Sequence, residues 1–304
     1  MTALPIAVAP EVTDAIAAGR PVLACESTIL THGLPRPRNL EVARDAERRA
    51  RAADVVPATI GVLDGVVRIG LSGTELERLA SDPDVVQLSG RDLPLAVATG
   101  ASGGTTVAAT AHLAHHAGIR VFATGGLGGV HRGAARTFDE SADLPALARL
   151  PIVVVSAGVK SVLDVGATLE RLETLGIPVA GYRTAAFPGF YVADSGHRVG
   201  HVLDSPEQAA AAWAAGRALG LDAALLVANP LPVAEQLPPD EHDAVLERAV
   251  AALDERGIGG QDATPFLLEH IRTATGGASL EANVAVYRNN VDLGARIAVA
   301  VAAL

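Results

Sequence analysis

Short apolar runs alternate with segments of helical pattern along most of the chain. The apolar runs predict strands at 21–25, 55–63, 66–69, 85–88, 121–124, 152–156, 179–182 and 223–227. The segments between and after them predict helices at 40–52, 73–80, 105–117, 161–175, 206–219, 240–257, 265–274 and 279–304. This alternation is typical of an α/β fold in which helices cover a central sheet.

Two of the expected strands, 152–156 and 223–227, are apolar on both faces. Such strands are typical of a sheet that is covered by helices on both sides. The sequence contains no internal repeat, low-complexity run or linker-like segment that would divide it. We therefore expect one α/β domain over residues 1–304, built on a layered sheet.

Composition and charge narrow the choice of function. The chain has 304 residues, a formal net charge of −10 and only 3% aromatic residues. This charge provides no basic face for DNA or RNA, although a local pocket can still bind a small anion. No apolar stretch is long enough to span a membrane, so we expect no membrane partner. Cys25 is the only cysteine, which excludes intrachain disulfides and indicates a reducing cytoplasm.

Lysine is almost absent from this sequence. Of the 24 basic residues, 23 are arginine and one is Lys160. A lysine amine can lose its proton and form an imine, whereas arginine cannot. The alternative is a surface lysine that survives by chance, and position must decide between the two.

The position of Lys160 favours a functional role. It follows the expected strand 152–156 and a Ser-Ala-Gly turn, at the strand end where ligands bind in open α/β sheets. A helix that begins at residue 161 would place its positive N-terminal end beside the amine and lower the pKa of Lys160. We therefore predict that Lys160 is an imine-forming nucleophile.

Glycines are concentrated in three loops, at 100–104, 125–133 and 257–260. The loop 125–133 follows an apolar strand, and its glycines allow backbone N–H groups to approach an anion. Its spacing matches neither a P-loop nor a dinucleotide fingerprint. A tight solvent loop is the alternative, but it does not account for His131 and Arg132 at the end of the segment. We favour a binding loop that includes His131.

Carboxylates at two places suggest further chemistry. Glu26 ends the apolar run 21–25, where burial would raise its pKa into the range of a general acid or base. A helix cap or a core ion pair is the alternative for Glu26.

Segment 137–143 holds three carboxylates and two hydroxyl groups, which suit a hard divalent cation. The same segment could instead be a capping turn for a helix from Asp143, with Ser141 or Asp143 as the cap.

Six segments together resemble the pseudouridine-5′-phosphate glycosidases, in order and at matching spacing from about Pro10 to the C-terminus. They are Ala24-Cys-Glu-Ser-Thr-Ile-Leu-Thr-His-Gly-Leu-Pro35, Gly104-Thr-Thr-Val-Ala-Ala-Thr110, Val121-Phe-Ala-Thr-Gly-Gly-Leu-Gly-Gly-Val-His-Arg-Gly133, Thr137-Phe-Asp-Glu-Ser-Ala-Asp143, Ser156-Ala-Gly-Val-Lys-Ser161 and Val227-Ala-Asn-Pro230. The resemblance implies a three-layer α/β/α fold, with a largely parallel or mixed central sheet, and a homotrimer.

The resemblance also implies a reaction: reversible cleavage of the C–C bond between uracil and ribose 5-phosphate. Lys160 matches the lysine that forms a Schiff base at C1′ after ring opening, and Glu26 matches the proton donor. Asp139 matches the ligand of a divalent ion, most suitably Mn²⁺, held largely through waters. A carboxylate pair alone does not suit this bond, because a C-glycosidic bond has no heteroatom leaving group to protonate.

Substrate contacts follow from the same resemblance. Val107 and the run Ser141, Ala142 and Asp143 match substrate-binding positions, and Asn283 matches a polar residue near the base. One departure concerns Gln87, because the family carries a lysine there; Gly90 also replaces a usual basic residue. Either Arg91 compensates for the lost charge or the substrate differs.

Two alternative functions remain open. One is a synthase that joins ribose 5-phosphate to an aromatic natural product through a C–C bond. The other is a non-catalytic module that retains the fold and binds a sugar phosphate.

Overall fold

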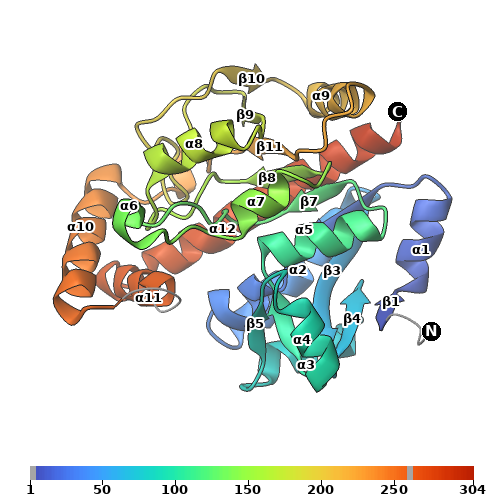
Figure 1. Ribbon diagram of the computed structural model, residues 1–304, viewed down its shortest axis with the longest axis horizontal. Helices are drawn as coiled ribbons and strands as arrows, with labels where there is room; N and C mark the ends of the chain where they lie inside the picture. Colours follow the sequence, from blue (N-terminus) through green and yellow to red (C-terminus); the bar gives the residue numbers. More distant parts are fainter. Residues whose placement is uncertain (1–4, 259–262) are drawn as a thin grey trace.

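Eleven strands form one mixed sheet in the computed structural model, which describes residues 5–258 and 263–304 (Figure 1). Its main path runs in the order β1-β4-β3-β2-β7-β8-β11-β9-β10, and β6 links β5 to β3. The strands are β1 (Ile6–Val8), β2 (Val22–Cys25), β3 (Val56–Leu63), β4 (Val66–Ile69), β5 (Val86–Leu88), β6 (Gly103–Thr105), β7 (Val121–Ala123), β8 (Val153–Ser156), β9 (Val179–Tyr182), β10 (His201–Leu203) and β11 (Leu225–Ala228).

Helices connect most of these strands. They are α1 (Pro10–Ala17), α2 (Arg38–Ala52), α3 (Gly73–Ser81), α4 (Leu93–Thr99), α5 (Val107–His116), α6 (Ala134–Thr137), α7 (Asp143–Leu147), α8 (Val165–Thr174), α9 (Pro206–Ala218), α10 (Pro239–Arg256), α11 (Ala263–Ala274) and α12 (Ala278–Ala302). A π-helical turn, η1 (Ile29–Gly33), and a 3-10 turn, η2 (Val233–Glu235), complete the set. Within the described residues, no helix is both long and apolar enough to cross a membrane.

The centre of the sheet is parallel. Strands β2, β7, β8 and β11 lie side by side in this order and all run the same way. Among the strands of the described residues, only β3 has antiparallel partners, namely β4 and β6. The carboxyl ends of the four central strands therefore meet at one edge of the sheet, where α/β proteins place their ligands.

Alternating strand residues bury the two faces of the sheet under different helices. Phe122 and Val154 belong to an apolar core that includes α1, α5, α7 and α8. Ala123 and Val155, their neighbours in sequence, belong to a second core formed with α2, α9 and α12. Figure 1 shows α12 crossing behind the sheet while α5, α7 and α8 cover its front. The expected three-layer α/β/α architecture with a mixed, mostly parallel sheet is confirmed.

The main differences from the sequence prediction concern short elements. Strands β1, β6 and β10 have three residues each, too few to give a visible alternation of apolar residues. Helices α1, α4 and α6 were likewise not predicted. The expected helix 161–175 begins only at Val165, with Asp164 as its N-cap. Residues 259 and 260 of the expected glycine loop 257–260 lie outside the described part of the chain.

Candidate active site

The central strands carry the candidate residues at their carboxyl ends. Glu26 follows β2, Thr124 follows β7, Lys160 follows β8 by four residues, and Asn229 follows β11. Three residues after Glu26 the π-helical turn η1 begins, a conformation that is frequent at functional sites. Four segments that are far apart in sequence thus converge at one edge of the sheet.

Glu26 is buried and hydrogen-bonded. The Thr124 hydroxyl donates to its Oε1 atom, and the backbone N–H of Gly125 is near enough to act on the charge of the carboxylate. Burial raises the pKa of the Glu26 carboxyl, whereas the nearby charge of Lys160 and the Thr124 hydrogen bond act to lower it. This upward shift of the pKa agrees with the sequence prediction, and Glu26 is not the N-cap of any helix in the described residues. Cys25 next to it is a poor nucleophile, because burial raises the pKa of its thiol to about 12.

Lys160 lies half-buried in the turn between β8 and α8. The backbone N–H of Lys160 donates to the Leu127 carbonyl (3.0 Å), and the backbone N–H of Leu127 donates to the Gly158 carbonyl (3.0 Å). The amine is close enough to influence the charge state of Glu26. The expectation that a helix N-terminus flanks Lys160 is wrong, because Asp164 caps α8 four residues later. The proximity of Lys160 to Glu26 now carries the argument for a functional lysine.

The glycine loop 125–133 is not a solvent loop, since residues 125–130 are buried. A Cβ atom at Gly126 would lie 2.6 Å from the Phe190 ring, and one at Gly128 would lie 2.2 Å from Ser141 Oγ. These positions therefore require glycine, because the surrounding groups leave no space for a side chain. The loop lies against the lysine turn on one side and residues 139–141 on the other.

Asp143 connects the glycine loop to α5. Its Oδ1 accepts the N–H of Ala108 (2.8 Å) and its Oδ2 accepts the N–H of Gly128 (2.8 Å). Both oxygens of this buried carboxylate are thus engaged by backbone donors, and its charge adds to the upward shift in the pKa of Glu26. Val107, the first residue of α5, lies next to Ala108 and is buried. The predicted substrate-binding positions Val107 and Asp143 are therefore neighbours in space.

The carboxylates of segment 137–143 do not converge on one point, so they do not form a joint cation site in this structure. Asp139 faces His131, with 3.7 Å between Oδ2 and Nδ1. Glu140 pairs with Arg171 (2.8 Å), and Asp143 turns inward to its backbone donors. The capping alternative is wrong as to the residue, because the N-cap of α7 is Ala142 and no side chain caps the helix, although the Ser141 hydroxyl accepts the N–H of Asp143 (3.2 Å).

A metal at Asp139 would find few protein ligands. Asp139 and His131 offer two side chains, and the described residues contain no group of three or more His, Cys, Asp or Glu side chains that could hold an ion. Divalent ions with several waters are commonly bound through one or two carboxylates and a substrate phosphate. The residues fit such a hydrated ion and not a closed protein cage.

Two further predicted positions lie around this centre. Asn283 of α12 is near the glycine loop, because a Cβ atom at Gly125 would lie 3.7 Å from its Oδ1. Gln87 is exposed in β5 and pairs in register with Gly104, which packs closely against Thr31 in η1. Gln87 therefore lies one strand away from the segment that follows Glu26.

Known proteins resemble this chain over nearly its whole length. A family model described as "Indigoidine synthase A like protein" matches residues 11–300. The chain belongs to this family. A pseudouridine-5′-phosphate glycosidase of Saccharopolyspora erythraea is 64% identical over 299 residues, which cover 98% of each chain. A pseudouridine-5′-phosphate glycosidase of Streptomyces griseus is 60% identical over 293 residues, 96% of this chain and 91% of that one.

Solved structures show the same fold. The crystal structure of the prealnumycin C-glycosynthase AlnA in complex with ribulose 5-phosphate matches with a TM-score of 0.92 and 35% identity, over 98% of this chain and 97% of that one. An indigoidine synthase A-like protein of Thermotoga maritima matches with a TM-score of 0.87 and 38% identity, over 97% and 95% of the two chains.

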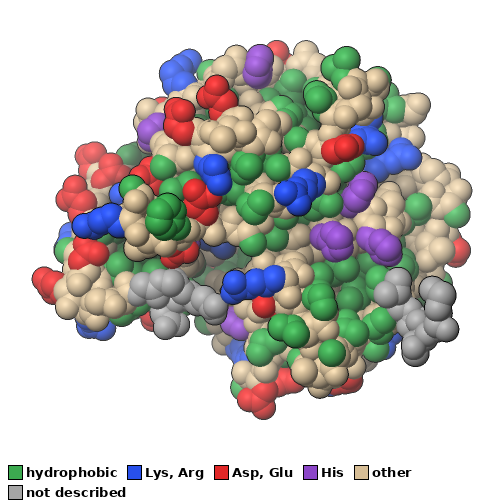
Figure 2. All heavy atoms as spheres, in the orientation of Figure 1, with side chains coloured by type: hydrophobic (Ala, Val, Ile, Leu, Met, Phe, Trp, Pro, Cys, Tyr) green, Lys and Arg blue, Asp and Glu red, His purple; other side chains and the backbone are tan. Residues whose placement is uncertain are grey.

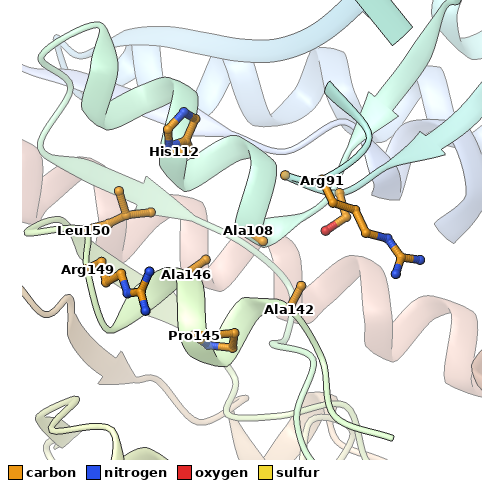
Figure 3. Close-up of a pocket in the computed structure, with 10 residues that line it drawn as sticks. Arg91, Ala108, His112, Ala142, Pro145, Ala146, Arg149 and Leu150 are labelled. Atoms are coloured by element: carbon orange, nitrogen blue, oxygen red, sulfur yellow. The ribbon is translucent and has the colours of Figure 1, made fainter. Parts of the chain in front are cut away.

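In this member of the indigoidine synthase A like family, a cavity of about 370 Å³ lies between α5 and α7 (Figure 3). It reaches Ala108 and Ala142, and Figure 3 shows Arg91 and Arg149 at its opposite ends. Arg91 is mostly exposed, with 3.6 Å between its Nε and the Asp92 carboxylate. Neither Glu26 nor Lys160 lines the cavity, so it adjoins the candidate active site without containing it.

Figure 2 shows how charged side chains are distributed on the face of the molecule seen in Figure 1. Basic side chains lie at several separate places, while acidic side chains gather over α10.

The aromatic segment 187–191 lies inside the chain. Phe187, Phe190 and Tyr191 are buried. The N–H of Phe190 donates to the Ala157 carbonyl (3.1 Å), and its ring covers Gly126. The segment therefore supports the lysine turn and the glycine loop from inside.

Sequence reasoning missed Asn290. Its amide donates to the carbonyls of Thr124 (2.7 Å) and Gly125 (3.0 Å), next to the Glu26 carboxylate. A signal was present: in the long apolar helix predicted at 279–304, Asn290 falls on the same helix face as Val286 and Leu293, three or four residues away. A polar residue on an apolar helix face is informative, because burying an amide requires hydrogen-bond partners.

Proposed function

We propose that this chain reversibly cleaves the C–C glycosidic bond of pseudouridine 5′-phosphate to uracil and ribose 5-phosphate. The observation that carries the proposal is the proximity of the chain's only lysine to the buried carboxyl of Glu26, at the ligand-binding edge of the sheet. The names of the relatives from Saccharopolyspora erythraea and Streptomyces griseus support the same reaction.

In the proposed reaction the neutral amine of Lys160 bonds to C1′ of the sugar while the ring oxygen leaves C1′, and the proton that the nitrogen loses passes to that oxygen. The C1′–C5 bond then breaks: its electron pair goes to C5 of uracil, which takes a proton from Glu26. The nitrogen lone pair of Lys160 forms the C=N bond of the imine in the same step. Water hydrolyses the imine and releases ribose 5-phosphate. A raised pKa suits Glu26 to this role, since it keeps the carboxyl protonated closer to neutral pH.

The surrounding positions suit the rest of the substrate. Val107 and the run Ser141, Ala142 and Asp143 would bind the sugar phosphate, and His131 lies at the end of the same glycine loop. Asn283 would face the base, because it lies beside the loop that holds the Glu26 donors. Since Lys160 is committed to the imine and no other lysine exists, arginines and backbone N–H groups must supply the attraction for phosphate.

A divalent ion, most suitably Mn²⁺, is part of the proposal. Asp139 would hold it, with His131 as a neighbouring donor and waters in the remaining positions. When bound, the ion would supply positive charge to oxygen atoms of the anionic substrate.

A C-ribosylating synthase is the second candidate. The structural match to AlnA, whose complex contains ribulose 5-phosphate, favours it, as does the uncharged Gln87. Both candidates use the same imine, whereas a non-catalytic sugar-phosphate-binding module would not form one.

Uracil release decides between the candidates. The protein is incubated with pseudouridine 5′-phosphate and Mn²⁺, and uracil is followed by chromatography, with Lys160→Arg as the control that keeps the charge. We expect uracil from the wild type and none from the variant. No uracil from a folded wild-type protein would rule out the glycosidase, and release by Lys160→Arg would rule out the imine.

We also propose that the protein is a homotrimer located in the cytoplasm. Phe138, which is 86% exposed beside Asp139, is an apolar side chain that a subunit contact would cover. Light scattering after size-exclusion chromatography tests this, and a monomer at micromolar concentration would contradict it.

A further inference from the structure

Asn290 is a fully buried amide on the sheet-facing side of α12. Its own exposed fraction is 0%, and the apolar residues Val286 and Leu293, four positions before it and three after it in the helix, are buried as well. An amide in such surroundings costs free energy unless its polar atoms are hydrogen-bonded. The Nδ2 atom donates to two carbonyls, Thr124 (2.7 Å) and Gly125 (3.0 Å), and Oδ1 accepts from Asn229 Nδ2 (3.0 Å). Asn229 thereby fixes which side of the amide faces the loop.

The contact with Thr124 determines where the next N–H points. In a trans peptide the C=O and the N–H of the same peptide group point in opposite directions. Because Asn290 holds the Thr124 carbonyl on the α12 side, the N–H of Gly125 points the other way, toward Glu26, and acts to lower the pKa of that carboxyl. The Thr124 hydroxyl donates to the same carboxylate. Both donors to Glu26 thus belong to the two residues that Asn290 clamps.

The same network reaches the lysine side of the site. The N–H of Asn229 donates to the Ser156 carbonyl (2.8 Å), and the N–H of Ala157 donates to the Gly125 carbonyl (2.9 Å). Ser156 ends β8, and Ala157 begins the turn that leads to Lys160. The two asparagines therefore join the backbone that orients Glu26 to the backbone that carries the amine.

We propose that Asn290, oriented by Asn229, is a positioning residue for the proton-donating step: it holds the Thr124–Gly125 peptide so that both donors face Glu26 and keep its carboxyl in place beside Lys160. It acts through the backbone and touches no substrate atom in this scheme. The inference rests on the proposed function, since it assigns a role in the same reaction.

The test compares Asn290→Ala with Asn289→Ala. Asn289 is a matched control, because it is the next residue of the same helix and its amide also donates to a backbone carbonyl, that of Pro230 (3.0 Å). We measure kcat and KM for uracil release across pH, and thermal unfolding by circular dichroism. For Asn290→Ala we expect kcat to fall roughly 10- to 100-fold, as for a displaced catalytic group, with KM changed less. If Glu26 is the proton donor, kcat falls as the pH rises through the pKa of its carboxyl, and we call this fall the Glu26 limb of the profile. The Glu26 limb should move to higher pH, because loss of the donors destabilises the carboxylate.

A purely structural role would lower the unfolding temperature without moving that limb. An Asn290→Ala profile that coincides with those of the wild type and Asn289→Ala would overturn the inference. If Asn290→Ala does not fold, Asn229→Ala provides the second test: the limb should move in the same direction, and an unmoved limb would contradict the proposal. A wild type that releases no uracil would instead refute the proposed function itself.

Discussion

A single added methyl group at Gly128 should disable the site. The Cβ of Gly128→Ala would lie 2.2 Å from Ser141 Oγ and 2.8 Å from Asp143 Oδ2, both much shorter than ordinary contacts. Ser141 and Asp143 belong to a segment whose backbone is itself held by the loop, since the N–H of Ser141 donates to the Gly129 carbonyl (2.9 Å). The clash must therefore push the segment 141–143 and the glycine loop apart by about 1 Å.

The magnitude follows from the bonds that this displacement breaks. Asp143 accepts two backbone N–H groups at 2.8 Å, from Ala108 and from Gly128 itself. A hydrogen bond to a charged group contributes about 1.5–3 kcal/mol, so weakening both bonds should cost about 3 kcal/mol of folding free energy. A displacement of about 1 Å at a positioned catalytic group costs roughly 100-fold in rate, so kcat/KM should fall by about that factor.

Thermal unfolding and steady-state kinetics of uracil release test this reasoning. Gly216→Ala is the control, because Gly216 lies in α9 with nothing within 4 Å of an added Cβ. It should keep full activity and gain up to about 1 kcal/mol, since alanine is favoured over glycine in helices. Wild-type stability and activity in Gly128→Ala would refute the assignment of Asp143 as the link between the loop and α5.

Three further changes have defined outcomes. Lys160→Arg should fold with unchanged unfolding temperature but lose at least about 10³-fold in kcat, because arginine forms no imine; turnover within tenfold of wild type would count against the scheme. Thr124→Val removes the hydroxyl that stabilises the Glu26 carboxylate, so the pKa of Glu26 should rise further and its limb in the kcat profile should move to higher pH; a shift to lower pH would contradict the assignment. Asp139→Asn should raise the Mn²⁺ concentration required for half-maximal activity by roughly 10-fold or more, as loss of a metal-ligating group does, with Glu140→Gln as a control that leaves it unchanged.

The regular elements and the location of the candidate residues Glu26 and Lys160 could be predicted because their signals are local. The apolar runs of β3, β8 and β11 mark strands directly, and the single lysine in an arginine-rich chain is visible in the composition. The rise in the pKa of Glu26 followed from its position at the end of a buried strand. The structure brings Glu26 and Lys160 together as expected, because both follow parallel strands of the same sheet edge.

The rest depended on contacts between distant segments. The carboxylates of 137–143 are adjacent in sequence, but their partners at 131, 171 and 108 pull them in different directions. The start of α8 at Val165 was missed because Ser161 and Asp164 can both begin a helix, and only the backbone pairing of Asp164 with Val130 selects the later one. The role of Asn290 arises from a loop that lies 165 residues earlier in the chain.

Covalent trapping of Lys160 tests the central claim most directly. The protein is mixed with ribose 5-phosphate, reduced with borohydride, digested and analysed by mass spectrometry. Because Lys160 is the only lysine, a side-chain adduct has a single possible location, and only the N-terminal amine can compete. We predict one reduced sugar-phosphate adduct on the peptide that contains Lys160, and none there in Lys160→Arg. A wild-type protein that releases uracil yet carries no adduct at Lys160 would contradict the account.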